Sequence, residues 1–253
     1  GALIEAAGIP PLRREVAVRY GAAPRALRAA WSAFTADTGD LTSHRWNALW
    51  DTATRRPLRI FGSFVPAPGT SASAPVAEKH ARDFLARHAA LLLAGNSIDD
   101  FDLVANDDDA GLRTVAFQQT IRVGDQRVPV VGGRVNLRYK ADRLFMLGAE
   151  ALPTATLDAP LAAPVAGRAA ALSYLAPAQP TASVLHHTLV ALPLVRARGV
   201  KLVLAWQIAT ESHSPASLTD VFVDARDASV IASHENLRFL TGALKYEAPL
   251  RGP

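Results

Sequence analysis

The sequence predicts an α+β protein of two tandem units, each a helix packed on an antiparallel β-sheet, preceded by an N-terminal strand–helix–strand extension. The first observation behind this prediction is helical spacing of apolar residues in two segments, 75–93 and 162–175. The second is that each of these segments is followed by stretches in which apolar and polar residues alternate. Alternation with a period of two is typical of strands with one buried face, and short turns between such strands make them antiparallel.

The spacing of apolar residues also predicts the strands and helices of the extension and of the first unit. Residues 13–20, 45–51 and 58–65 alternate as strands, and residues 23–34 have the spacing of a helix. In the segment 75–93, one face of the predicted helix is apolar and Gly95 stands just past its end. That face carries Ala77, Ala81, Phe84, Leu85, His88 and Leu92.

Residues 117–135 predict a β-hairpin around which the first unit is organised. Gly124 and the following aspartate supply the turn, because glycine readily adopts a positive φ. Pro129 cannot donate a ladder hydrogen bond, so the return strand should begin at an edge or a bulge. Gly132 and Gly133 indicate a bend or a close backbone approach. We take the motif residues to be structural; they are Phe117, Gln119, Gly124, Pro129, Gly132 and Gly133.

The Pro- and Ser-rich stretch 66–75 is the clearest candidate linker. It divides the chain into an extension at 1–66 and a first unit at 67–153. A second unit is expected at 154–235, followed by a tail at 236–253 without a clear pattern. The second unit repeats the layout of the first without obvious sequence identity.

Composition narrows the class of protein. Of the 253 residues, 49% are hydrophobic and 20% are charged, which is ordinary for a soluble globular protein. No apolar run approaches the ~18 residues of a membrane helix, so we expect no membrane insertion. No leader begins the chain, so any signal peptide has been removed or never existed. The net charge is +4. The arginines are scattered along the sequence, with no aromatic residues alternating with them to stack on bases, so we expect no nucleic-acid partner.

A search for chemistry is mostly negative. The sequence has no cysteine, no His-Glu-x-x-His helix, no Gly-x-Ser-x-Gly elbow and no phosphate-binding glycine loop. His186 and His187 are adjacent in a predicted strand, so they should point to opposite faces. The acidic run 99–109 lacks the spacing of a calcium loop and is interpreted as solvated turns. We therefore predict no catalytic, cofactor-binding or metal-binding residue in this chain, and a binding or folding module ranks above an enzyme.

The hairpin motif resembles the signature of the fungalysin/thermolysin propeptide (FTP) domain, through Phe117-Gln118-Gln119, Gly124, Val128-Pro129-Val130 and Gly132-Gly133. Residues 50–62 are similar to the strand–turn–strand that opens such pro-regions, with Arg55 where glycine is usual. Residues 204–208 and 221–231 resemble a following PepSY-type half, with Ala228 at the usual turn glycine. The implied fold of each unit is cystatin- or PepSY-like.

The resemblance implies the pro-region of a secreted zinc metalloendopeptidase. Such a zymogen segment acts as inhibitor and intramolecular chaperone of the protease domain, which would hold the zinc and would be this chain's partner. The implied location is secreted, periplasmic or extracellular, in a bacterium. The tail would reach the protease cleft, and Arg251 is the candidate cleavage point. The candidate contact residues are Phe239, Tyr246, Leu250 and Arg251.

Two alternatives stay open. The first is a stand-alone extracellular binding module with no protease partner. The second is an unrecognised hydrolase that uses histidine, serine and aspartate, and His186, His187 and His213 would be its residues to mutate.

Overall fold

A computed structural model of the chain describes residues 18–39, 45–51, 54–153, 164–196 and 199–236. It is an α+β structure with a large mixed sheet and few helices, which confirms the predicted class at that level. The helices are α1 (Arg28–Thr38), α2 (Ala74–Arg87), α3 (Ala89–Leu92) and α4 (Pro164–Leu175). The strands are β1 (Val18–Tyr20), β2 (Asn47–Asp51), β3 (Pro57–Pro66), β4 (Phe101–Asp109), β5 (Leu112–Val123), β6 (Gln126–Lys140), β7 (Arg143–Ala149), β8 (Ser183–Arg196), β9 (Gly199–His213), β10 (Ala216–Asp224) and β11 (Val230–Glu235).

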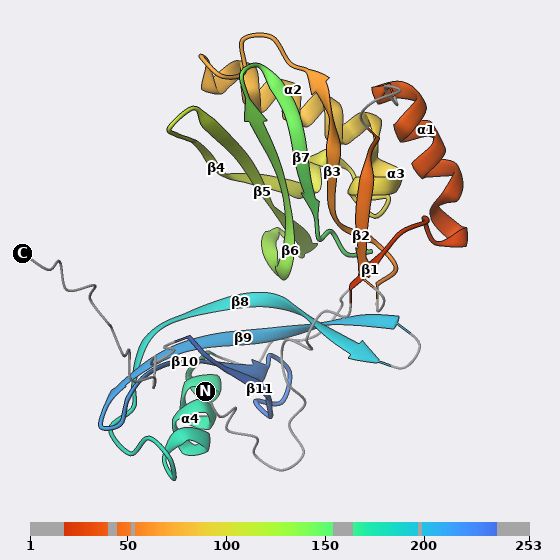
Figure 1. Cartoon of the computed structure of the whole chain (residues 1–253). Coiled ribbons are helices and arrows are strands. Elements are labelled where there is room, and N and C mark those ends of the chain that lie inside the picture. Colours follow the sequence, from red (N-terminus) through yellow and green to blue (C-terminus); the bar gives the residue numbers. More distant parts are fainter. Residues whose placement is uncertain (1–17, 40–44, 52–53, 154–163, 197–198, 237–253) are drawn as a thin grey trace, which may run out of the picture.

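The strands β1 to β7 form the first part of the sheet, in the spatial order β1-β2-β3-β7-β6-β5-β4. Helices α1, α2 and α3 lie on one face of this part, as Figure 1 shows. The covered face is apolar because alternate residues of each strand point toward the helices. One row of that face, running across the strands, consists of Ala48, Ile60, Leu147, Leu137 and Val115.

The predicted helix at 75–93 is present but interrupted. Ser73 caps α2, its side chain accepting from the Val76 amide at 3.5 Å. Helix α2 ends at Arg87. His88 is not helical, and α3 begins directly after it. The predicted apolar face is buried, from Ala77 through Leu92. Gly95, with a φ of 86°, follows α3 in the left-handed conformation expected of a residue that terminates a helix.

The strands β8 to β11 form an antiparallel meander with α4 on one face. Ala171 and Leu175 of α4 pack in one cluster with Ile208, Val221 and Val223. The meander joins the first part through a single parallel bridge between Val130 of β6 and Ala191 of β8. Apolar side chains from both parts pack around this bridge; among them are Ile121, Val128, Leu152, Leu189 and Leu202.

One sequence interpretation is wrong. The acidic run at 99–109 is not a series of turns: it forms a short 3-10 turn at Ile98–Asp100 and then β4, which pairs with β5. Only Phe101 of β4 is buried. Because β4 lies at the edge of the sheet and is mostly exposed, its side chains need no apolar alternation, and the strand carries no sequence pattern.

The candidate linker is a packed turn in the structure. Ala67 and Thr70 are buried, and the Ala67 amide donates to the Asp142 carbonyl at 2.8 Å. Strand β3, which precedes this turn, pairs with β7, which lies beyond α2 in the sequence. The predicted boundary at residue 66 therefore falls within a continuous sheet, although the division into four segments stays a prediction.

Candidate binding surface

The predicted hairpin is confirmed as β5 and β6. Val123 pairs with Gln126, which leaves Gly124 and Asp125 as a two-residue turn, and Gly124 has a φ of 57°. Pro129 pairs with Thr120 at the last position before the register shifts. On the other side of the shift, Gln118 pairs with Arg134, so the single residue between Gln118 and Thr120 faces a four-residue bulge of β6. Pro129 therefore lies at the margin of a bulge.

The bulge is held by one side-chain amide. The Nε2 of Gln118 donates to the carbonyl oxygens of Val130 at 2.6 Å and of Gly133 at 3.0 Å. The two glycines serve different purposes. Gly132 has a φ of 74°, which disfavours any residue with a Cβ. A Cβ added to Gly133 would lie 2.8 Å from the Oε1 of Gln119.

Gln119 fixes the end of the first part of the sheet. Its side chain is fully buried. The side-chain amide forms two hydrogen bonds with the backbone of Leu152, the pattern that a paired residue of a neighbouring strand would form. Its Nε2 donates to the Leu152 carbonyl at 2.7 Å, and its Oε1 accepts from the Leu152 amide at 2.8 Å. Asn96, also buried, donates to the same carbonyl at 2.9 Å. The amide pair therefore anchors the chain where it leaves β7 for the second half.

Sequence reasoning identified Gln119 as a motif residue but did not predict this contact. The available signal was its position, because Gln119 continues the buried register of Val115 and Phe117, where an amide must find a partner. Phe117 itself is fully buried, with the guanidinium carbon of Arg82 4.9 Å from its ring centroid.

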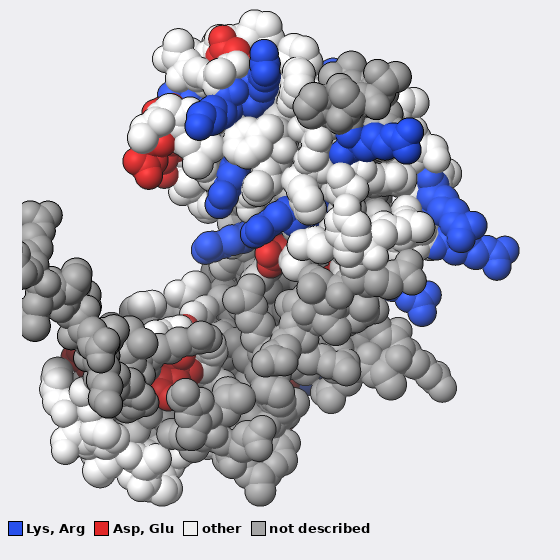
Figure 2. Space-filling model, viewed as in Figure 1, with Lys and Arg blue, Asp and Glu red and all other residues white. Residues whose placement is uncertain are grey.

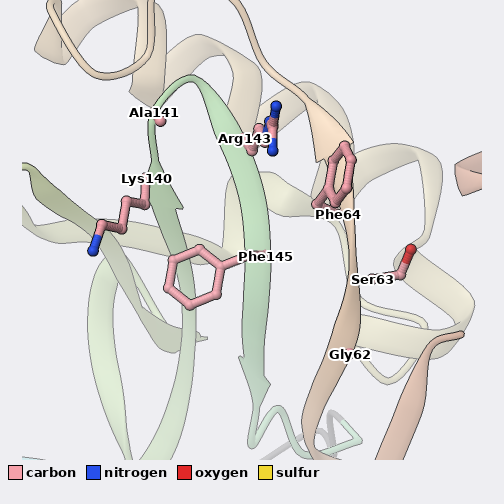
Figure 3. Close-up of a pocket in the computed structure, with 7 residues that line it drawn as sticks. All are labelled: Gly62, Ser63, Phe64, Lys140, Ala141, Arg143 and Phe145. Carbon is pink, nitrogen blue, oxygen red and sulfur yellow. The ribbon is translucent and has the colours of Figure 1, made fainter. Parts of the chain in front are cut away.

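A shallow hollow opens on the other face of the same sheet (Figure 3). Between the pairs Phe61–Met146 and Val65–Leu144, three residues of β3 lie opposite only Phe145 of β7. Strand β6 also shifts register against β7 at this point. The two irregularities leave an open hollow of about 330 Å³. Its lining residues are Gly62, Ser63, Phe64, Lys140, Ala141, Arg143 and Phe145.

The hollow is mostly apolar, with two cations at its rim. Lys140 is exposed, and the guanidinium carbon of Arg143 lies 4.6 Å from the centroid of the Phe64 ring. Figure 3 shows the Phe64 and Phe145 rings on neighbouring strands, with Arg143 beside Phe64 and the Lys140 side chain extending away from the rings. Such a site can accept an apolar side chain and attract a carboxylate next to it.

The turn between β6 and β7, which separates Lys140 from Arg143, is hydrogen-bonded to the segment before α2. Asp142 accepts from the Ser71 amide at 2.8 Å, and its own amide donates to the Ser71 hydroxyl at 2.8 Å. Hydrogen bonds from the backbone of Ser71 and Gly69 lower the pKa of the Asp142 carboxyl. The carboxylate is therefore the stable form at neutral pH, and the turn stays tied to the segment that precedes α2.

The candidate contact residues of the tail (Phe239, Tyr246, Leu250 and Arg251) lie outside the described residues. His186 and His187 are both exposed on β8, and His213 is exposed at the end of β9. Within the described residues, no group of three or more His, Asp or Glu side chains could hold a metal ion. No helix in that part of the chain has the length and apolar character needed to cross a membrane.

No protein-family model and no curated protein sequence matches the chain. Among solved structures, the chain is similar to the Bacillus megaterium YpeB C-terminal domain, with a TM-score of 0.39 and 10% sequence identity. The alignment covers 87% of this chain and 89% of that domain.

Proposed function

We propose that this chain is a non-catalytic pro-region of a secreted zinc metalloendopeptidase, which inhibits the protease domain and assists its folding. In this proposal the chain consists of tandem helix-on-sheet units, at 67–153 and 154–235, and the zinc belongs to the protease.

The observation that carries the proposal is the structural role of the motif residues. Gln119 anchors Leu152, Gly132 has the left-handed conformation, and Gly133 leaves room for Gln119. Gly124 forms the turn and Pro129 borders the bulge. Residues that resemble the propeptide hairpin thus act together in one local structure, which supports a shared fold rather than a chance match of letters.

The inhibitory action follows from binding equilibria. A partner that binds only the native protease stabilises it by mass action. Covalent attachment raises the effective concentration of that partner to about millimolar, so an interface of micromolar affinity stays occupied before cleavage and dissociates on dilution after it. Edge strands such as β4 and β11 also offer backbone groups for strand-type pairing with a cleft.

A titration tests this function. The purified chain is added to a mature thermolysin- or fungalysin-type protease from the same organism, and peptide hydrolysis is measured. We expect inhibition at micromolar concentrations and a higher yield of active protease after refolding with the chain present. Neither effect with any such protease, together with no His-Glu-x-x-His motif encoded downstream of Pro253, would sink the proposal.

A stand-alone extracellular binding module is the second candidate. The hollow around Phe145 favours it, because an aromatic-lined surface site with cations at its rim is suited to a partner of any kind. A protein that binds a partner through this site but leaves the proteases untouched would support this candidate over the first.

A further inference from the structure

Basic side chains gather on the face of the first sheet that no helix covers. Arg59 of β3, Arg134, Arg138 and Lys140 of β6, and Arg143 of β7 lie on this side or at its rim. Figure 2 shows lysine and arginine side chains collected over β6 and β7, with acidic side chains at the β4 edge. Alternation places this face opposite the row of Leu137 and Leu147, which packs toward the helices.

The arrangement brings like charges together. Residues 134, 138 and 140 share one face of a single strand, and Lys140 pairs directly with Arg143 across the β6–β7 turn. Like charges that face each other across a sheet destabilise it. Within the described part of the chain, none of the five cations lies within ion-pair distance of a carboxylate.

Some arginines elsewhere in the protein form ion pairs with carboxylates. Arg127, at the opposite end of β6, lies 2.8 Å from Asp102, and Arg226 lies 2.9 Å from Asp224. Acidic residues border the face: Asp142 in the β6–β7 turn accepts a hydrogen bond from Ser71, Glu150 follows β7, and Asp107 and Asp109 lie on the edge strand β4. Arg25 and Arg28, near the start of α1, also lack an ion pair within the described residues, but the basic side chains of the uncovered face lie around an apolar hollow.

The same face carries apolar side chains. Phe61, Phe145 and Met146 are half-buried, and the hollow of about 330 Å³ lies between them and the Lys140–Arg143 turn. A surface kept only for solubility would not need aromatic rings among its cations. Cations around an apolar hollow are complementary to a ligand that presents carboxylates around an apolar side chain.

We propose that this uncovered face, formed by β3, β7 and β6, is a docking surface for an acidic polypeptide segment, one of whose apolar side chains enters the hollow at Phe145. An extended segment repeats its side chains on one side about every 6.8 Å, which matches the two-residue spacing of Arg138 and Lys140 and is half the spacing of Arg134 and Arg138. A nucleic acid fits less well, because Arg143 already covers the Phe64 ring and the acidic strand β4 borders the face. The proposal does not depend on the partner being a protease.

The test measures binding of a defined probe. A fluorescein-labelled peptide of glutamates and aspartates with one central phenylalanine is titrated with the full chain, and fluorescence anisotropy is followed at low and at raised salt. We expect saturable binding that weakens as salt rises. The variant K140Q/R143Q should bind about tenfold more weakly, since it removes two exposed or rim charges. Phe145→Ala should also bind more weakly, but with an unchanged salt dependence.

The matched control is R25Q/R28Q, which removes the same charge from two exposed positions, one in the 3-10 turn before α1 and one at the first residue of α1. It should bind as the unmodified chain does. Equal weakening by both double variants would show an unspecific charge effect and overturn the proposal. Tighter binding of oligo(dT) or an RNA oligonucleotide than of the peptide, lost in K140Q/R143Q, would assign the face to nucleic acid and also overturn it.

Folding is checked by circular dichroism and thermal melting of every variant. Should K140Q/R143Q fail to fold, Lys140→Gln alone replaces it, because this side chain is exposed and forms no hydrogen bond or ion pair with another described residue. The experiment contains no protease, so a chain that binds the peptide but inhibits nothing would contradict the proposed function and leave the docking surface standing.

Discussion

The first sheet and the second meander are stabilised in different ways. The first has one connected core, in which Phe34 of α1 contacts Trp31, Trp46, Phe84 and His88 with ring centroids 5.1–6.1 Å apart. In the second, α4 packs alanine and leucine onto one face, while a separate cluster around Phe222 lies on the other. A connected core spreads the effect of a substitution, whereas smaller clusters on opposite faces of a sheet confine it.

The largest loss of stability is expected when the Phe34 ring is removed from the first core. Phe34→Ala should cost about 3–5 kcal/mol of unfolding free energy, because it leaves a cavity among four aromatic neighbours. Phe222→Ala is the matched change, since that side chain is also fully buried but is surrounded by smaller residues. Urea unfolding of both variants measures the difference. An equal or larger loss for Phe222→Ala would contradict the comparison.

Substitutions in the bulge of β6 should have the next largest effect on stability. Gly133→Val should destabilise the protein by about 1–3 kcal/mol, since its Cβ would press on Gln119 and disturb the anchor at Leu152. Gly132→Ala should cost about 1–2 kcal/mol through backbone conformation alone, because nothing lies within 4 Å of an added Cβ. Thermal melting gives both values. If either variant melts as the unmodified protein does yet no longer binds a partner, the hairpin is a contact surface rather than a structural element.

A smaller change should improve the second half. Gly167 lies inside α4, and an added Cβ would meet the Trp206 side chain at an ordinary contact distance of 3.4 Å. Gly167→Ala should therefore raise stability by about 0.5–1 kcal/mol, through helix propensity. Differential scanning calorimetry measures the shift. A decrease would mean that the α4 surface has less room than this contact implies.

The smallest expected effect is the change of folding stability with pH. Burial lowers the pKa of His88 and of His80, and the nearby Arg87 lowers both further. The Nε2 of His88 lies 3.1 Å from an Asp37 oxygen, and the Asp37 charge only partly offsets the effect of burial on the pKa of His88. Because the folded pKa lies below the unfolded value of about 6.5, the unfolded chain takes up the proton first.

Stability should thus be full above about pH 6.5 and fall as the pH drops through the unfolded and then the folded pKa. Urea unfolding of the protein and of His88→Gln between neutral and mildly acidic pH measures this slope. The variant should show a smaller slope, whereas His213→Gln, at an exposed position, should leave it unchanged. A steeper slope in His88→Gln would show that its protonated form is stabilised in the fold.

Much of the local structure could be predicted because it depends on neighbouring residues. Turn glycines, the apolar face of α2 and the alternation of β5 and β6 are encoded within short segments. The edge strand β4 could not be predicted, since its exposed aspartates leave no period in the sequence. The hollow could not be predicted either, because it needs a bulge where β3 pairs with β7, and these neighbouring strands lie far apart in the sequence.

The run Asp107-Asp108-Asp109 has a consequence for assembly. Among the strands that the structure describes, β4 pairs only with β5, so its outer backbone groups could in principle add another strand. A second copy that placed its own β4 there would set two rows of aspartates against each other, and their repulsion opposes such self-association at neutral pH. A strand with complementary basic side chains would meet no such barrier, so the acidic edge keeps identical molecules apart while it leaves the backbone accessible to a different chain.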